Sequence, residues 1–219
     1  MKPILFNTEM VRALLEGRKT VTRRAIRPQP EGRPIRMTEN SCYPGCYAIE
    51  GTPRVIRPPY QPVDILYVRE TWNGDWCDHY IYKADGGSAK AAGYTAEPKW
   101  RPSIHMPKEA ARLFLRVKGV RVERLGDITD DQCEAEGVVG WTKDGKLYKY
   151  APADPEGDGP AWKWQDCPTI PQEAMRRAWD STIKPNDRAT YGWEANPWVW
   201  VIEFERISKD EALGGGRDG

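Results

Sequence analysis

Long hydrophobic runs are absent from this sequence. Nowhere in its 219 residues do about 18 apolar side chains follow one another, which is the length that a membrane-spanning helix requires. The apolar core of a secretion signal is missing as well, because Asn7, Thr8 and Glu9 interrupt the first ten residues. We therefore expect a cytoplasmic protein that does not contact a membrane.

The sequence also has no excess of either charge. Its 33 lysines and arginines face 32 aspartates and glutamates, which leaves a net charge of +1. A protein held to nucleic acid by its overall field carries a clear positive excess, so the composition gives no support to that mode of binding. Any binding of an anion must come from a local cluster of basic residues.

Cysteine is scarce and odd in number. Five cysteines without an export signal fit reduced thiols better than a framework of disulfides. Cys42, Cys46, Cys77 and His79 are soft ligands of the kind that zinc prefers. Their spacing is loose and no second Cys-x-x-Cys pair supports them, so we expect free thiols and no metal or other cofactor.

Phenylalanine is rare, with three residues, whereas tryptophan and tyrosine number ten each. Trp and Tyr rings combine an apolar face with a polar atom, and they stack well on nucleic-acid bases. The balance indicates either aromatic surfaces that bind a base or a core that uses tryptophan, and composition does not separate the two.

The order of segments predicts one α+β domain over residues 1–208, followed by a flexible tail at 209–219. Pro- and Gly-rich stretches at about 28–62 and 138–168 are expected to be insertions that add nothing to the core. Strands are expected at residues 2–6, 64–72, 79–83, 112–124 (with a bulge at Gly119) and 198–207. Helices are expected from the cap at Asn7 or Thr8 to Gly17, over 128–137 with Thr129 and Gln132 as a capping box, and over 170–183.

The densest chemical signal is a basic segment that runs from Gly17 to Arg24, with no acidic residue before Pro30. Such a patch can hold a phosphate, an RNA backbone or another anion. In an extended chain, Lys19 and Arg23 face one way while Thr22 and Arg24 face the other. A turn that joins Lys19 and Thr22 would form a minimal pair of base and nucleophile, provided that Lys19 loses its proton. The alternative is a basic turn in contact with solvent.

A second signal is Glu136, in the last turn of the helix expected over 128–137. The negative end of the helix dipole and the neighbouring Glu134 both disfavour an ionised carboxylate there, which suits a general acid. The alternative is an ordinary exposed helix end.

Two further segments offer groups that could bind a base. In the strand that ends at Trp72, Arg69 and Glu70 could read a base edge while Trp72 stacks on it, or Arg69 and Glu70 could be a structural pair. His105 lies in a loop between Pro102 and Pro107, where it is either a site residue on a rigid support or a structural histidine.

Together these segments resemble the ASCH family, a branch of the PUA-like β-barrel superfamily, and especially its phage and prophage members. The family pattern GxKxxExR is matched at Gly17, Lys19 and Arg24 and departs from it at Thr22. At this point the sequence is similar to GRKTxTxR of the family's bacterial N4-acetylcytidine amidohydrolases. The phage-type members also resemble PILFNTEMVRALLEGRKT, DILYVRETW and WRPSIHMP of this chain.

The resemblance implies a small mixed PUA-like barrel with flanking short helices and two insertions. It implies an amidohydrolase that removes an N-acyl group from a modified cytidine or a related pyrimidine nucleoside, with Thr22 as nucleophile, Lys19 as proton acceptor and Glu136 as proton donor. The expected partner is a modified nucleoside or RNA, without an obligatory protein partner. The alternative, which the family also contains, is an RNA- or nucleotide-binding module or a ribonuclease. The residues expected to bind substrate are Arg24, Arg69, Glu70, Trp72 and His105.

Overall fold

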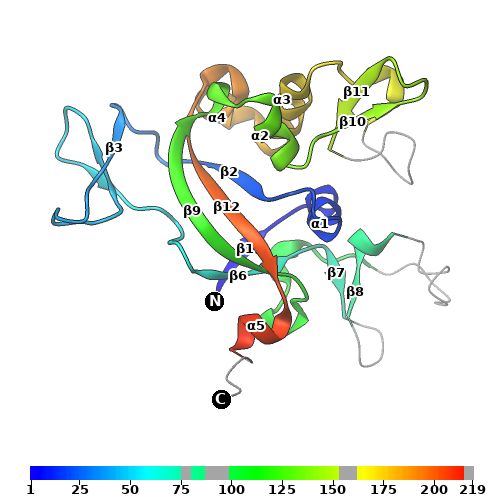
Figure 1. Cartoon of the computed structure of the whole chain (residues 1–219), viewed down its shortest axis with the longest axis horizontal. Helices are drawn as coiled ribbons and strands as arrows, with labels where there is room; N and C mark the ends of the chain where they lie inside the picture. The colour runs from blue at the N-terminus through cyan, green and yellow to red at the C-terminus, as the bar shows by residue number, and fades with distance from the viewer. Residues whose placement is uncertain (75–79, 87–98, 153–161, 215–219) are drawn as a thin grey trace.

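The computed structural model describes residues 1–74, 80–86, 99–152 and 162–214. Its centre is a five-stranded mixed sheet in the order β1, β6, β9, β12, β2. β1 runs parallel to β6, and the other neighbours are antiparallel. With the helices around it (Figure 1), the sheet confirms the predicted α+β class. The five strands span Lys2–Leu5, Ile65–Arg69, Phe114–Arg124, Trp198–Ile207 and Val21–Ala25, respectively.

The last strand, β12, is apolar on both faces because both are covered. Val199 and Val201 pack into a cluster with α2 (Asp130–Ala135) and α3 (Pro171–Thr182). Trp200 and Ile202 pack into a second cluster with β1 and α1 (Thr8–Leu15). The strand has the predicted bounds. Its register with β9 shifts beside Gly119, where the predicted bulge is confirmed.

The sheet does not close into the predicted barrel. β1 and β2 are its two outer strands, and in the described part of the chain they do not pair with each other. β1 is only four residues long and leads straight into α1, so little strand is present to pair. Arg24 Nη2 on β2 instead donates to the main-chain oxygen of Leu5 at 2.6 Å. A side chain therefore bridges the gap that ladder hydrogen bonds fill in a closed barrel.

Helices lie on both faces of the sheet, and the three that the sequence predicts begin where expected. Asn7 Oδ1 caps α1 by accepting from the Met10 N–H at 2.9 Å, and the Thr129–Gln132 capping box of α2 is present. A short helix, α5, occupies part of the expected tail, because Ser208 caps it. The α-helices are α1 (Thr8–Leu15), α2 (Asp130–Ala135), α3 (Pro171–Thr182), α4 (Arg188–Tyr191) and α5 (Lys209–Leu213). Short 3-10 helices lie at Lys83–Asp85, Ser103–His105, Lys108–Ala110, Leu125–Asp127, Trp164–Asp166, Pro185–Asp187 and Trp193–Ala195.

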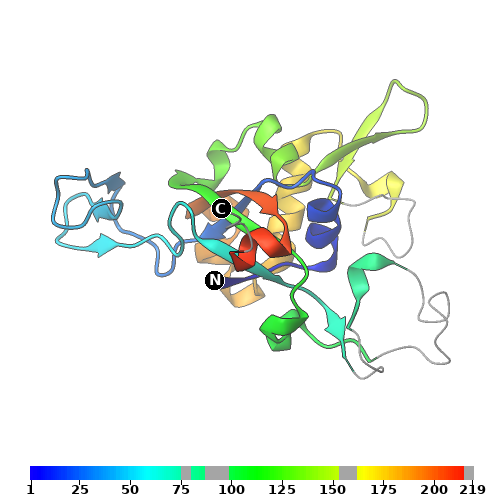
Figure 2. The same ribbon diagram turned by 60° about the horizontal axis from the view of Figure 1, so that its bottom comes forward.

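Both segments expected as insertions contain small sheets of their own. The sheet β3–β4–β5 projects from the rest of the molecule in Figure 1 and Figure 2. The expectation that residues 28–62 add nothing to the core is wrong, since Tyr47 and Ile49 are buried in the main cluster and the Tyr47 ring meets Trp200 edge-on. The remaining strands are β3 (Pro34–Arg36), β4 (Tyr47–Ile49), β5 (Val55–Ile56), β7 (Trp72–Asn73), β8 (Ile81–Tyr82), β10 (Val139–Thr142) and β11 (Tyr148–Ala151).

Candidate functional site

A cavity of about 330 Å³ opens where the sheet is not closed. The end of β1 and the start of α1 form one side, the outer edge of β2 forms the floor, and α3 forms the opposite wall. Lys19, Thr22, Arg24 and Glu136, which the sequence singled out separately, all line it. The cavity is therefore the candidate site.

Lys19 is placed by the ends of two helices. Gly17 takes a left-handed backbone with φ of +75°, which ends α1 and turns the chain back. The N–H groups of Arg18 and Lys19 then donate to the Ala13 oxygen, and the Thr20 N–H donates to the Ala135 oxygen of α2. This turn fixes the residues just before β2 between α1 and α2.

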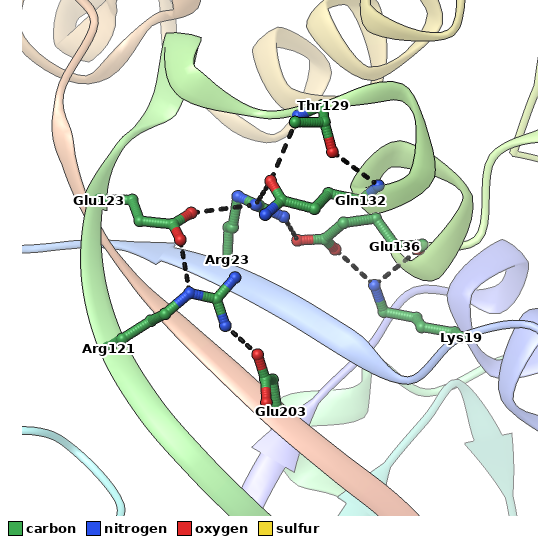
Figure 3. Close-up of polar contacts among 8 residues, drawn as sticks. All are labelled: Lys19, Arg23, Arg121, Glu123, Thr129, Gln132, Glu136 and Glu203. Carbon is green, nitrogen blue, oxygen red and sulfur yellow. Dashed lines mark hydrogen bonds and ion pairs between the residues drawn. The ribbon is translucent and has the colours of Figure 1, made fainter.

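The Lys19 side chain is buried against Glu136 (Figure 3). Lys19 Nζ lies 2.6 Å from Glu136 Oε2 and 2.7 Å from the Glu136 main-chain oxygen. The two side chains are 1% and 3% exposed, so water does not screen the pair. The basic segment and Glu136, which are far apart in the sequence, thus meet in the structure.

Burial and neighbouring charges act on Lys19 in opposite directions. Burial lowers its pKa from the usual value, and this is the larger effect. The Glu136 carboxylate raises the Lys19 pKa in return, while Arg23 and Arg24 lower it further. The net result is a lowered pKa for Lys19, which is the direction that a lysine acting as a base requires.

Arg23 holds the other side of the Glu136 carboxylate, a role that sequence reasoning missed. Its Nη1 lies 3.2 Å from Glu136 Oε1, while Nη2 donates to Gln132 Oε1 at 2.7 Å and to Glu123 Oε2 at 3.3 Å. Arg121 in turn donates hydrogen bonds to both Glu123 and Glu203, which extends the network away from Glu136 (Figure 3). The alternation along β2, which puts Arg23 on the side of Lys19, was the signal that could have identified it.

Thr22 and Arg24 point to the opposite face of β2 from Arg23. They lie across from Ile202 and Trp200 of β12. Thr22 is buried and lines the cavity together with Lys19 and Glu136. The Arg24 guanidinium lies over the Phe6 ring, 5.4 Å from its centroid. The cavity therefore combines a hydroxyl, an amine, a carboxylate and a guanidinium.

The other four residues expected to bind substrate lie elsewhere. Glu70 is 1% exposed and accepts from Arg112 Nε and Nη2 at 2.9 and 3.0 Å, so its partner is Arg112 and not Arg69, with which the sequence alternative paired it. Trp72 is buried in a cluster with Met106. None of Arg69, Glu70, Trp72 and His105 is among the described residues that line the cavity.

Arg69 and His105 belong to one corner of the molecule. Arg69 Nη1 donates to the Ile104 oxygen at 3.3 Å, which ties the end of β6 to the 3-10 helix that contains His105. His105 is exposed. A role for these residues in substrate binding stays a prediction.

A second cavity of about 300 Å³ adjoins the first and shares Asn7, Met10 and Ala178 with it. Its remaining lining includes the carboxylates of Glu9 and Asp166. Trp162 and Asp166 come from the segment expected as the second insertion, which thus reaches the neighbourhood of the candidate site.

No set of three or more metal-ligating side chains gathers anywhere in the described ranges. Cys42 is exposed and Cys46 is buried, both with free thiols, while Cys77 and His79 lie outside those ranges.

The helices in the described ranges are all too short or too polar to cross a membrane.

Comparison with known proteins identified no relative. No family model, no curated protein and no solved structure matches this chain.

Proposed function

We propose that this protein is an amidohydrolase of the ASCH type that removes an N-acyl group from a modified cytidine or a related pyrimidine nucleoside. The observation that carries the proposal is the buried contact of 2.6 Å between Lys19 Nζ and Glu136 Oε2, in a cavity that Thr22 also lines. The motif from Gly17 to Arg24 supports it, and so does its resemblance to the PUA-like family.

The proposed mechanism uses one proton that passes between Lys19 and Glu136, whose side chains are in contact. With the proton on Glu136, Lys19 is a neutral amine that can accept a proton and Glu136 is an acid that can donate one. Burial disfavours two separate charges here, and it lowers the pKa of Lys19. The neutral form of Lys19 is therefore more accessible than it would be in water.

Acyl transfer to Thr22 uses both members of the pair. Thr22 Oγ1 attacks the acyl carbonyl carbon while Lys19 Nζ takes the hydroxyl proton. The carbon–nitrogen bond then breaks as Glu136 gives its proton to the departing N4, which leaves with the nucleoside as its amine. Arg24, on the same face of β2 as Thr22, stabilises the negative oxygen of the tetrahedral intermediate.

Water completes the cycle. It attacks the acyl ester on Thr22 while Glu136 takes a proton from the water. Lys19 returns its proton to Thr22 Oγ1 as the ester bond breaks. A carboxylic acid is released, and the pair again holds one proton on Glu136 with Lys19 neutral.

The size and lining of the two cavities fit a nucleoside. About 330 Å³ falls within the range of small-ligand sites, roughly 300–1,000 Å³. Met175 and Trp179 of α3 provide an apolar wall for a base. In the adjoining cavity, Glu9 and Asp166 offer carboxylates, which accept hydrogen bonds from sugar hydroxyls.

Binding of RNA or cleavage of RNA, the alternative from the sequence, requires cations that are available to phosphate. Lys19 and Arg23 are each paired with Glu136 instead. Affinity for a phosphate backbone falls steeply with salt, whereas hydrolysis of a neutral nucleoside hardly responds. Turnover of N4-acetylcytidine that is insensitive to salt supports the hydrolase, and salt-dependent binding of RNA without turnover supports the alternative.

The direct test compares two substitutions of Thr22. Thr22→Ser keeps a hydroxyl and should retain measurable hydrolysis of N4-acetylcytidine. Thr22→Val keeps the shape without the hydroxyl and should lose at least about 10²-fold in kcat. If Thr22→Val is as active as the wild type, Thr22 is not the nucleophile.

A further inference from the structure

The strand that forms the floor of the cavity has an unpaired backbone edge. β2 is the last strand of the sheet, and β12 is its neighbour. The Phe204 N–H donates to the Thr20 oxygen and the Ile26 N–H donates to the Trp198 oxygen, which sets the phase of the ladder. Residues of an antiparallel strand alternate between those whose backbone groups bond to the partner strand and those whose backbone groups point away from it, so Thr22 and Arg24 bond to β12 and the residues on either side of them point outward.

Arg23 and Ala25 occupy such outward positions, and both line the cavity. Their N–H and C=O groups therefore point away from β12, at an edge of β2 that borders the cavity. The described residues offer no backbone hydrogen bond to either of them from this side. Backbone groups without a partner bind readily to a ligand that supplies complementary atoms.

We infer that the outer edge of β2 reads the base of the substrate, with the Arg23 C=O accepting from the N4–H of a cytosine and the Ala25 N–H donating to its N3. Along this edge, the Arg23 C=O is a hydrogen-bond acceptor, and the Ala25 N–H, two residues further on, is a donor beside it. The cytosine edge presents the complementary donor beside an acceptor. Uracil has the opposite pattern, with O4 as acceptor and N3–H as donor, so this edge rejects it.

This placement agrees with the chemistry. N4 carries the acyl group and lies next to the edge at Arg23, one residue from Thr22. The acyl carbon is thereby brought to the face of β2 on which Thr22 lies. The inference rests on the proposed function for the identity of the ligand, but base recognition can be measured without any hydrolysis.

An unpaired strand edge can also bind a peptide by adding a strand, and the structure favours a base over that occupant. α3 stands across the cavity from β2, with Ala178, Trp179 and Thr182 in the opposite wall. The space of about 330 Å³ between β2 and α3 has the size of a small-molecule site, whereas an added strand needs a free edge along its whole length.

Binding of three nucleosides to the wild-type protein, measured by calorimetry, tests the inference. Cytidine offers the matching pair of groups, 3-deazacytidine lacks the N3 acceptor, and uridine inverts both groups. We expect cytidine to bind at least about tenfold more tightly than either of the others, since each mismatch leaves a buried backbone group without a partner. Equal affinities, or no binding of cytidine, overturn the inference.

A backbone variant provides an independent measurement. Ala25→Pro removes the outward N–H without breaking a hydrogen bond to β12, and an outer strand tolerates proline at such a position. Ala25→Ser keeps the N–H and is the matched control. Ala25→Pro should weaken binding of cytidine by about tenfold and leave 3-deazacytidine unchanged, whereas Ala25→Ser should still discriminate between them.

The outcomes separate this inference from the proposed function. An equal loss for both nucleosides in Ala25→Pro overturns the reading of N3. If Ala25→Pro does not fold, the wild-type series alone decides. Hydrolysis of N4-acetylcytidine without discrimination among the three nucleosides keeps the proposed function and removes this inference. If the protein discriminates among the three nucleosides but does not hydrolyse N4-acetylcytidine, this inference is kept and the proposed function is removed.

Discussion

Lys19 Nζ and Glu136 Oε2 lie 2.6 Å apart although 117 residues separate them in the chain. The pair joins the turn before β2 to the end of α2, and it is shielded from water. A buried pair of this kind is costly to form from solvated ions, and it contributes less to stability than its short distance indicates. In the proposed mechanism, the pair acts through the proton that the two groups exchange.

Replacement of Lys19 by alanine should abolish hydrolysis. Without the amine, nothing accepts the Thr22 proton, and such roles account for about 10²-fold or more in rate. The measurement is kcat for N4-acetylcytidine, with circular dichroism as the control for folding. Activity within about tenfold of the wild type would remove Lys19 from proton transfer.

Glu136→Gln should bind substrate nearly as well as the wild type and turn over at least about 10²-fold more slowly, because the amide keeps the shape but cannot deliver a proton. Arg23 still finds an oxygen acceptor in this variant. Single-turnover kinetics separates the loss of chemistry from a loss of binding. A variant with wild-type turnover would make Glu136 a structural helix end.

The pH profile of the wild type should be bell-shaped, because only the pair with a single proton is active. The acidic limb arises when the pair takes up a second proton, and the alkaline limb when it loses its last one. Burial lowers the pKa of Lys19, so the alkaline limb should fall below 10.5, the ordinary value. An alkaline limb at or above that value contradicts the assignment.

Arg23→Met tests a positioning residue. Arg23 lowers the pKa of Lys19, so its removal should move the alkaline limb of the pH profile upward. Breaking a buried ion pair should also destabilise the fold by roughly 3–5 kcal/mol. Arg121→Met is the matched control, since Arg121 contacts Glu123 and Glu203 but not Glu136. A loss of stability without a shifted limb would limit Arg23 to a structural role.

The thiols should differ in reactivity. Burial raises the pKa of Cys133 to about 12, so almost no thiolate is present near pH 8, whereas Cys42 is exposed. Labelling of the native protein with iodoacetamide, followed by peptide mapping, should modify Cys42 and spare Cys133. Equal labelling of the two would show that α2 opens readily.

Several helices and strands could be predicted from the sequence because their formation depends on residues that are close together in the chain. The capping box at Thr129 and Gln132 and the apolar run of β12 each specify their own element. The motif from Gly17 to Arg24 also led to Lys19 and Thr22, and the predicted helix end before Gly137 led to Glu136; the cavity brings the three together. These residues were recognised by their chemistry and not by their distance.

Contacts between distant segments could not be read in the same way. The gap between β1 and β2 depends on how far β1 extends beside β6, which no local pattern encodes. Glu70 looked available for a ligand because its partner, Arg112, is 42 residues away. Arg23 was assigned to a general basic patch, since only the fold reveals that Glu123 and Gln132 face it.

Gln132 has one side-chain oxygen, and two donors share it. Gln132 Oε1 accepts from the Thr129 N–H at the start of α2 and from Arg23 Nη2 on β2. A helix of six residues is too short to persist by itself, so α2 depends on such outside contacts. The first turn of α2 and the ion pair between Arg23 and Glu136 consequently form one cooperative unit. Slow deuterium exchange at the Cys133 amide, which donates to the Thr129 oxygen, therefore reports from outside the cavity whether Lys19, Arg23 and Glu136 are assembled.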